Sequence, residues 1–363
     1  MEEVNKMEKY YIEMPENELL RIQNNIWEHD YVDAKLKTAK QKLSIKIALR
    51  GNQLRKHKKK SYHIIFDKPY FMDGQHEIHL NAEYNDPSLM RNKLSFDFFE
   101  SIGVLAPQSV HILLYINDVC HGVYLQLESF DQYFLGNRKL PDGTIYYATN
   151  DDANFSLYTP DHKLKLTLED GYTKKYDYQN DSSLKRLLIA INTFPKEKFD
   201  EEISTILDVP KYLKWLIGVV CTQNFDGFIH NYALYHNSKS ELIEITPWDY
   251  DGTWGRDLHG RPLEHNYIPI EGYNTLTARL LDCGKFRLMY GEFLQEVLQT
   301  QFTEQYQKPL IEKLYNSIRP YIHKDPNMKD NAATFDDEPQ YILRFIQARN
   351  MYMESKLNGL INK

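Results

Sequence analysis

Two polar segments in the second half of the chain have the spacing of a phosphoryl-transfer site. Asp226 and Asn231 stand five residues apart, and Asp249 follows two predicted strands at 232–236 and 241–246. An Asp, an Asn and a later Asp occur in this order in protein-kinase catalytic lobes. Because a hairpin returns the chain to the end from which it started, the two segments can meet there. Singly, each residue is more often a turn or loop residue, and only the combination predicts a site.

The chemistry predicted for this trio is transfer of the γ-phosphate of ATP to a hydroxyl group. Asp226 would face the incoming hydroxyl and accept its proton. Asn231 and Asp249 would bind Mg²⁺, which prefers oxygen ligands and completes its shell with phosphate oxygens and water. Positioning and charge neutralisation around the phosphate would supply most of the rate enhancement.

The elements that must position these residues divide the chain near residue 128. The first half alternates apolar and polar residues over predicted strands 43–49, 61–66, 111–116 and 122–127, with one helix from Asp86 to Gly103. The second half carries helical periodicity at 184–191, from Asp208 onward, and at 286–302, 305–322 and 339–357. The pattern predicts an α+β chain with a small β-rich lobe, 1–127, and a larger, mostly helical lobe, 128–363.

Composition excludes several classes of protein. With 44 Lys and Arg against 51 Asp and Glu, the net charge of −7 argues against a dedicated nucleic-acid binder. The acidic, polar N-terminus is not a secretion signal, and the apolar runs fall short of the ~18–20 residues that span a bilayer. The three cysteines lack metal-ligand spacing and are expected to be reduced thiols. These features predict a soluble protein that acts neither on nucleic acid nor in a membrane.

Several longer motifs resemble those of the spore-coat protein H (CotH) kinase family. They are RG at 50–51 with KKKSY at 58–62, LNAEYNDPSLMRNKL at 80–94, DGFIHNYALY at 226–235 and WDYDGTWGRD at 248–257. The resemblance covers nearly the whole chain. It implies an atypical protein-kinase-like bilobal fold, use of ATP and Mg²⁺, and phosphorylation of serines in other spore-coat proteins, coat proteins B and G among them. It also implies synthesis in the mother-cell cytoplasm during sporulation, followed by incorporation into the spore coat.

Matching motif positions assign roles in the larger lobe. The resemblance implies that Asp226 is the catalytic base, Asp249 the principal metal ligand and Asn231 the second. Asp251 would help to hold a metal ion or would pair with Arg256. The segment that contains Arg256 would hold the peptide substrate of a kinase, and its charged residues are expected to shape that segment.

In the smaller lobe, five residues are candidates for nucleotide binding. A lysine must reach the phosphates, and strand alternation lets only one of Lys59 and Lys60 point inward. The sequence does not determine which one, and we expect it to be Lys60. A turn containing Arg50 would cover the phosphates. Glu128 would lie in the hinge between the lobes, where the backbone would meet adenine. Arg91 would either contact phosphate bidentately or pair with Asp97 or another acid on the surface.

Departures from ordinary protein kinases leave a second function open. The first lobe has no G-x-G-x-x-G loop, and its helix has Arg91 and Lys93 where a Glu would pair with the lysine. The alternative to an enzyme is a non-catalytic, pseudokinase-like scaffold for coat assembly, which would not need the Asp–Asn–Asp trio. For an active enzyme, the net negative charge predicts substrates whose serines lie among Lys and Arg.

Overall fold

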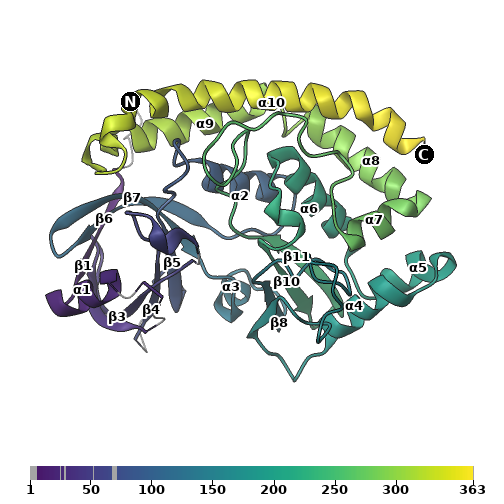
Figure 1. Ribbon diagram of the computed structural model, residues 1–363, viewed down its shortest axis with the longest axis horizontal. Coiled ribbons are helices and arrows are strands. Elements are labelled where there is room, and N and C mark those ends of the chain that lie inside the picture. Colours follow the sequence, from purple (N-terminus) through teal and green to yellow (C-terminus); the bar gives the residue numbers. More distant parts are fainter. Residues whose placement is uncertain (1–5, 25, 28–29, 52, 68–71, 363) are drawn as a thin grey trace. The chain divides into compact units, whose positions relative to one another are not determined.

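The computed structural model describes residues 6–24, 26–27, 30–51, 53–67 and 72–362. Both sheets and helices are present (Figure 1), which confirms the α+β class. The chain forms two compact units, each assembled from three segments. The first unit contains residues 1–93, 107–129 and 309–340, and the second contains 94–106, 130–308 and 341–363. The units therefore differ from the expected contiguous division at 127/128, because helices α2 (Arg91–Ser101), α9 (Glu304–Ile318) and α10 (Ala332–Ile361) continue from one unit into the other.

A closed barrel of seven strands forms the first unit, in the order β1-β2-β3-β4-β5-β7-β6. Neighbouring strands are antiparallel except β1 and β6, which run parallel and close the barrel. Alternate residues of β3, such as Ile45 and Ile47, fill its interior. The strands are β1 (Glu8–Glu13), β2 (Val32–Lys37), β3 (Lys42–Leu49), β4 (Tyr62–Phe66), β5 (Glu77–Asn81), β6 (Ser109–Ile116) and β7 (Val119–Glu128).

The four strands predicted in the first half are confirmed as β3, β4, β6 and β7, but three others were not predicted. Strand β5 is buried at every position, although its residues alternate between polar and apolar types, and the sequence-based prediction missed that alternation. The first half also contains a second helix, α1 (Glu16–Asn24), where only one was expected. Short 3₁₀ turns lie at Gln53–Lys56, Arg319–Lys324 and Lys329–Asn331. Helix α9 stops at Ile318, and the rest of the predicted helix to 322 falls within the 3₁₀ turn at Arg319–Lys324, which has Pro320 in its first turn.

Helix α2 starts five residues later than predicted, because residues 86–90 form a turn. Leu89 has a φ of 56°, which an α-helix does not allow. The Asp86 carboxylate instead accepts the backbone N–H of Ser88 at 2.8 Å and that of Arg91 at 2.9 Å, at the start of the helix. The predicted end is confirmed: Gly103 has a φ of 81° and its N–H donates to the carbonyl of Glu100.

The second unit combines helices with a four-stranded sheet in the order β11-β10-β8-β9. The predicted hairpin is confirmed as β10 (Tyr232–Asn237) and β11 (Leu242–Pro247), whereas β8 (Gly143–Ala148) and β9 (Tyr172–Tyr176) were not predicted. Helix α6 (Val209–Thr222) is almost wholly buried. The other helices of this unit are α3 (Gln132–Asn137), α4 (Ser183–Thr193), α5 (Lys196–Ile203), α7 (Thr275–Asp282) and α8 (Gly284–Gln299). No helix among the described residues combines the length and apolar character that crossing a bilayer requires.

Candidate functional site

The site in the second unit is built where α6 ends and the hairpin begins. Asp208 caps the start of α6 by accepting the N–H of Lys211 at 3.1 Å, as predicted. The helix ends at Gln223, whose φ of 59° turns the chain away from the helix axis. The side-chain oxygen of Asn224 then accepts the N–H of Gly227 at 3.1 Å, which stabilises the next turn. Asp226 begins this turn, a 3₁₀ helix over Asp226–Phe228.

The hairpin brings the two predicted segments together, as its geometry requires. The N–H of Trp248 donates to the carbonyl of Asn231 at 2.9 Å, just beyond the last paired residues of β10 and β11. The backbone carbonyl of Asp249 accepts the side-chain amides of Asn231 at 3.0 Å and Asn224 at 3.2 Å. Both Asn231 and Asp249 have a φ of 59°, a conformation that Asn and Asp tolerate better than most residues. With Nδ2 of Asn231 used as a donor, Oδ1 remains as its possible cation ligand.

Asp226, Asn231, Asp249 and Asp251 line one pocket of about 240 Å³. All four lie within the second unit. The rest of the pocket wall is formed by Gln223, Asn224, Phe225, Gly252, Asp257, Leu258, His259, Arg261, Leu263 and Tyr267. The structure therefore brings together every residue that the sequence assigned to the base and the metal ligands.

Burial and neighbouring acids make this pocket unfavourable for negative charge. Burial raises the pKa of Asp226, and the carboxylates of Asp151 and Asp249 raise it further, while His230 acts in the opposite direction. His230 lies beside Asp226 in the chain fold, and its Nδ1 is 2.9 Å from a carboxylate oxygen of Asp151. The contact with Asp151 gives His230 a physical basis for an orienting role in the pocket. A bound cation would relieve the repulsion that raises the pKa of Asp226.

The donor set of the pocket fits Mg²⁺. Three carboxylates, those of Asp226, Asp249 and Asp251, and the amide oxygen of Asn231 are hard oxygen donors, which Mg²⁺ prefers over nitrogen or sulfur. A few protein oxygens are sufficient, because the ion usually keeps water or phosphate oxygens in its remaining positions.

A hydrogen-bonded loop centred on Asp257, which we call the clasp, forms one wall of the pocket. Its carboxylate accepts the backbone N–H groups of His259 and Arg261, each at 2.9 Å, and the Arg261 side chain at 2.8–2.9 Å. Although burial opposes it, hydrogen bonding from Arg261 and His259 lowers the pKa of Asp257. The clasp leaves Leu258 49% exposed at the pocket rim. The expectation that charged residues shape this segment is therefore supported, and the contribution of Arg261 was not foreseen.

Arg349 of α10 is a second contributor that the sequence did not reveal. Its side chain is fully buried and donates to the carbonyls of Val220 at 2.7 Å, Ile268 at 2.7 Å and His265 at 2.9 Å. The carbonyl of His265 also accepts the side chain of Gln223, which lines the pocket. Arg349 thus ties the end of α6 to the segment behind the pocket. A partner 129 residues away along the chain has no local sequence signal.

Of the two candidate lysines in the first unit, Lys59 is the buried one. Its Nζ lies 2.9 Å from a carboxylate oxygen of Asp325 and 2.5 Å from the carbonyl of Val123. Lys60 is partly exposed and donates to the carbonyl of Arg55. Both lysines precede β4, so the expectation that strand alternation lets only one of them point inward does not apply to them. A phosphate contact from either lysine stays a prediction.

Arg91 lies in a buried cluster of charges within the first unit. Its guanidinium is 2.6 Å from a carboxylate oxygen of Asp86 and 2.6 Å from one of Glu338, and all three side chains are at most 1% exposed. Pairing with acids is therefore the alternative that the structure supports, in the core rather than on the surface. The full burial of Arg91 speaks against the bidentate phosphate contact.

Arg50 and Glu128 occupy different parts of the barrel. Arg50 is partly exposed and donates to the side-chain oxygen of Asn81 at 2.5 Å. Glu128 is buried at the end of β7, where its backbone N–H donates to the carbonyl of Gln108 at 2.9 Å and its carboxylate accepts the N–H of Gln108 at 3.0 Å. The N–H of Glu128 is thus already engaged in a backbone hydrogen bond within the first unit. A contact with adenine from this residue would need its carbonyl.

Comparison with known proteins decides the family. The model of the family described as CotH kinase protein matches residues 47–353. The chain belongs to the CotH kinase family. It is 46% identical over 353 residues to the inner spore coat protein H of Bacillus subtilis (strain 168), covering 97% of this chain and 98% of the relative. It is also 30% identical over 304 residues to an inner spore coat protein H-like protein of the same strain, covering 83% and 87%.

A search of solved structures finds a weaker likeness. The chain is similar to a chain in the complex of HipA, HipB and operator DNA from Shewanella oneidensis MR-1, with a TM-score of 0.38 and 10% identity. The match covers 99% of this chain and 75% of the other. A TM-score this low does not establish a shared fold. The motifs of the CotH kinase family and the geometry of the pocket carry the functional argument.

Proposed function

We propose that this member of the CotH kinase family is an ATP- and Mg²⁺-dependent protein kinase that phosphorylates serines of other spore-coat proteins, with an atypical kinase-like bilobal arrangement. The observation that carries the proposal is the pocket in which Asp226, Asn231, Asp249 and Asp251 meet. The names of the two relatives place those proteins in the inner spore coat or liken them to one that is there. We extend that association to this chain, with synthesis in the mother-cell cytoplasm before assembly.

In this mechanism Asp226 accepts the proton of a serine hydroxyl as its oxygen bonds to the γ-phosphorus of ATP and the bond to ADP breaks. Asn231, Asp249 and Asp251 would hold the cation, and the hydrogen bonds to the carbonyl of Asp249 fix the backbone on which they stand. Mg²⁺, when bound, offsets the negative charge of the phosphates. Ionised Asp226 is required at the start, so any group that lowers its raised pKa favours the active form.

The substrates that suit this pocket are basic, serine-rich proteins. Four of its lining residues are aspartates, and one of these is bound to Arg261. The chain as a whole carries a net charge of −7. Serines flanked by Lys and Arg would therefore approach with favourable electrostatics. Coat proteins B and G are the proposed partners, through membership of the family.

A transfer assay with purified protein, radiolabelled Mg-ATP and a basic serine-rich peptide tests the activity. We expect Asp226→Asn to lose about 10²- to 10⁴-fold in turnover, the range typical of a general base. Asp249→Ala should lose activity and its dependence on Mg²⁺ concentration. Asp161→Asn, which changes an exposed loop acid of the same unit, is the matched control and should keep full activity.

Full transfer activity in the Asp249→Ala protein would refute the assignment of the site. The non-catalytic scaffold is distinguished by a second readout, coat assembly in spores. If spores that carry Asp226→Asn and Asp249→Ala built a normal coat, the protein would act as a scaffold and the proposed activity would have no role in assembly.

A further inference from the structure

Two histidines and a glutamate of the first unit gather on one face of the barrel. His63 of β4 and His79 of β5 are direct cross-strand partners, and Glu77 stands two residues before His79. The alternate residues Ile64 and Ile78 belong to the barrel core, so the trio lies on the opposite face of these strands. Glu77 is 8% exposed and His79 7% exposed, which is unusual for a carboxylate and an imidazole with no catalytic assignment.

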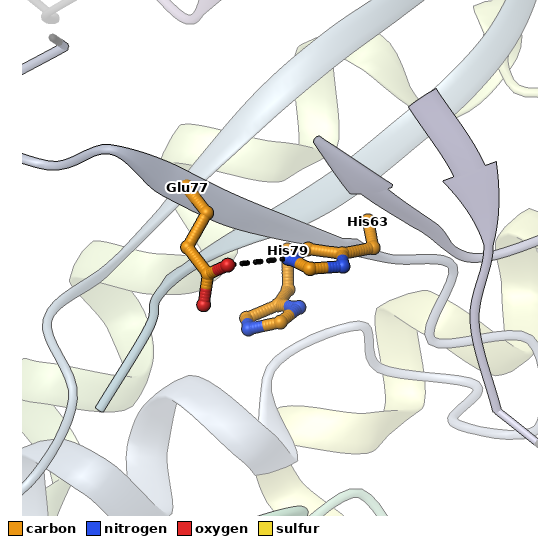
Figure 2. A group of neighbouring side chains, drawn as sticks. All are labelled: His63, Glu77 and His79. Atoms are coloured by element: carbon orange, nitrogen blue, oxygen red, sulfur yellow. Dashed lines mark ion pairs between the residues drawn. The ribbon is translucent and has the colours of Figure 1, made fainter. Parts of the chain in front are cut away.

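The ligand atoms of the three side chains lie close together, and the His63 and His79 rings are stacked. Figure 2 shows the carboxylate of Glu77 directed at the ring of His63, with the ring of His79 beside both. The distance from Nε2 of His63 to Oε2 of Glu77 is 3.2 Å, and one ligand atom from each residue lies within 4.8 Å of the others. A tetrahedral ion with bonds of about 2.0–2.2 Å separates its ligand atoms by roughly 3.3–3.6 Å. The pair of His63 and Glu77 already has nearly that spacing. The His79 ring is stacked on the His63 ring, with centroids 4.6 Å apart, and it would have to turn to direct a nitrogen at the same ion.

Residues outside the trio hydrogen-bond to its side chains, as the outer residues of metal sites do. The hydroxyl of Tyr31 is 2.7 Å from Nδ1 of His63, so Nε2 is the nitrogen of that ring directed to Glu77. The hydroxyl of Ser129 donates to Oε1 of Glu77, leaving Oε2 toward His63. Outer hydrogen bonds of this kind orient the rings of metal-binding histidines and the carboxylates beside them.

We propose that His63, Glu77 and His79 form a binding site for a borderline transition-metal ion of the Zn²⁺ type. Two imidazoles and one carboxylate are a donor set that suits Zn²⁺ better than Mg²⁺. Three protein ligands leave a fourth position for water. The site clamps β4 to β5 and is chemically distinct from the all-oxygen pocket of the second unit. It does not depend on the kinase activity proposed above.

Metal uptake by the whole chain tests the site. Chain carrying Asp249→Ala, to remove the other cation site, would be stripped with a chelator and titrated with Co²⁺, whose visible spectrum reports tetrahedral nitrogen and oxygen ligands. We expect one Co²⁺ per chain, displaced by Zn²⁺. Adding His63→Gln and His79→Gln should abolish uptake. His121→Gln, a change to a β7 histidine outside the trio, is the control and should leave uptake unchanged.

Two further measurements keep the test decisive if the double variant does not fold. Single variants Glu77→Gln and His79→Gln should each weaken Co²⁺ binding by 10-fold or more. In the unaltered chain, Zn²⁺ should shift the imidazole NMR signals of two histidines and raise the unfolding temperature, an effect that chelator reverses. Uptake below one ion per chain, or uptake unaffected by the histidine changes, would mean that the trio is only a hydrogen-bonded network.

Discussion

The two units use charged residues in opposite ways. In the first, Lys59 pairs with Asp325 and Arg91 with Asp86 and Glu338, and these side chains are at most 2% exposed. In the second, aspartates gather around a pocket, and burial together with neighbouring acids raises the pKa of Asp226. Paired buried charges stabilise one structure as long as both partners remain. Like charges that lie close together weaken the fold slightly, and they favour the binding of a cation, which relieves their repulsion.

This contrast explains why sequence patterns identified one set of charges more readily than the other. A pocket that binds a cation concentrates its acids on a few loops near one hairpin, so their spacing along the chain is informative. A buried pair needs only two residues that meet in space. Lys59 and Asp325 are 266 residues apart, and although the motif at 58–62 made Lys59 a candidate, nothing in the sequence marked Asp325 as its partner.

The largest expected effect comes from breaking a buried pair. Lys59→Met should lower the free energy of unfolding by about 3–5 kcal/mol, because it leaves Asp325 buried without its cation. Lys60→Met, at the partly exposed neighbour, should change it by less than about 1 kcal/mol. Urea unfolding of both proteins measures the difference. Equal effects would contradict the assignment of Lys59 as the structural lysine, and Lys59→Met with Asp325→Leu should recover much of the loss.

A second test introduces a methyl group beside the same acid. A Cβ at Gly122 would lie 2.2 Å from Oδ2 of Asp325, and Gly122 has a φ of 103°. Gly122→Ala should therefore cost more than the about 1–2 kcal/mol of a left-handed backbone alone. Gly136→Ala in α3 is the control, since nothing lies within 4 Å of its Cβ, and thermal unfolding should show no loss. A stable Gly122→Ala protein would show that Asp325 can leave its position.

Removing a charge from the pocket should raise the stability of the protein, whereas removing one from a buried pair lowers it. Burial raises the pKa of Asp226 above its unfolded value, so its contribution to stability is complete below the unfolded pKa and is lost as pH rises through the folded pKa. Ionised Asp226 is then unfavourable at neutral pH, and Asp226→Asn should stabilise the chain by roughly 0.5–2 kcal/mol there. Unfolding curves at several pH values measure this. The gain should vanish in acid, below the unfolded pKa, and a gain that persists there would have another cause.

The smallest effect concerns the pH dependence of the proposed transfer. His230 lowers the pKa of Asp226 against the larger effect of burial. Without that help, in His230→Gln, the pKa of Asp226 should rise, and the acidic limb of the rate profile should move to higher pH. His162→Gln, an exposed histidine in the same unit, should leave the profile in place. If the profile did not change in His230→Gln, the acidic limb would not report the ionisation of Asp226.

Most helices and strands could be predicted from local sequence signals. The alternation in β3 and the Asp208 cap of α6 are properties of a few consecutive residues, and both are confirmed. The start of α2 was wrong because Asp86 caps from a turn, with Leu89 at positive φ, and not from the position directly before the helix. Strand β5 was missed although its residues alternate between polar and apolar types, and only the structure shows that its polar residues are buried as well.

Sequence alone determined the family motifs, the α+β class and the Asp226, Asn231, Asp249 and Asp251 set. These are encoded in short stretches, because a hairpin converts spacing along the chain into proximity. Tertiary structure decided what the remaining charges do. It buried Lys59 against Asp325, placed Arg91 between two carboxylates, and brought His63, Glu77 and His79 together across neighbouring strands. Burial and partner are set by segments distant in sequence, so the same residue type can serve the core in one unit and a binding pocket in the other.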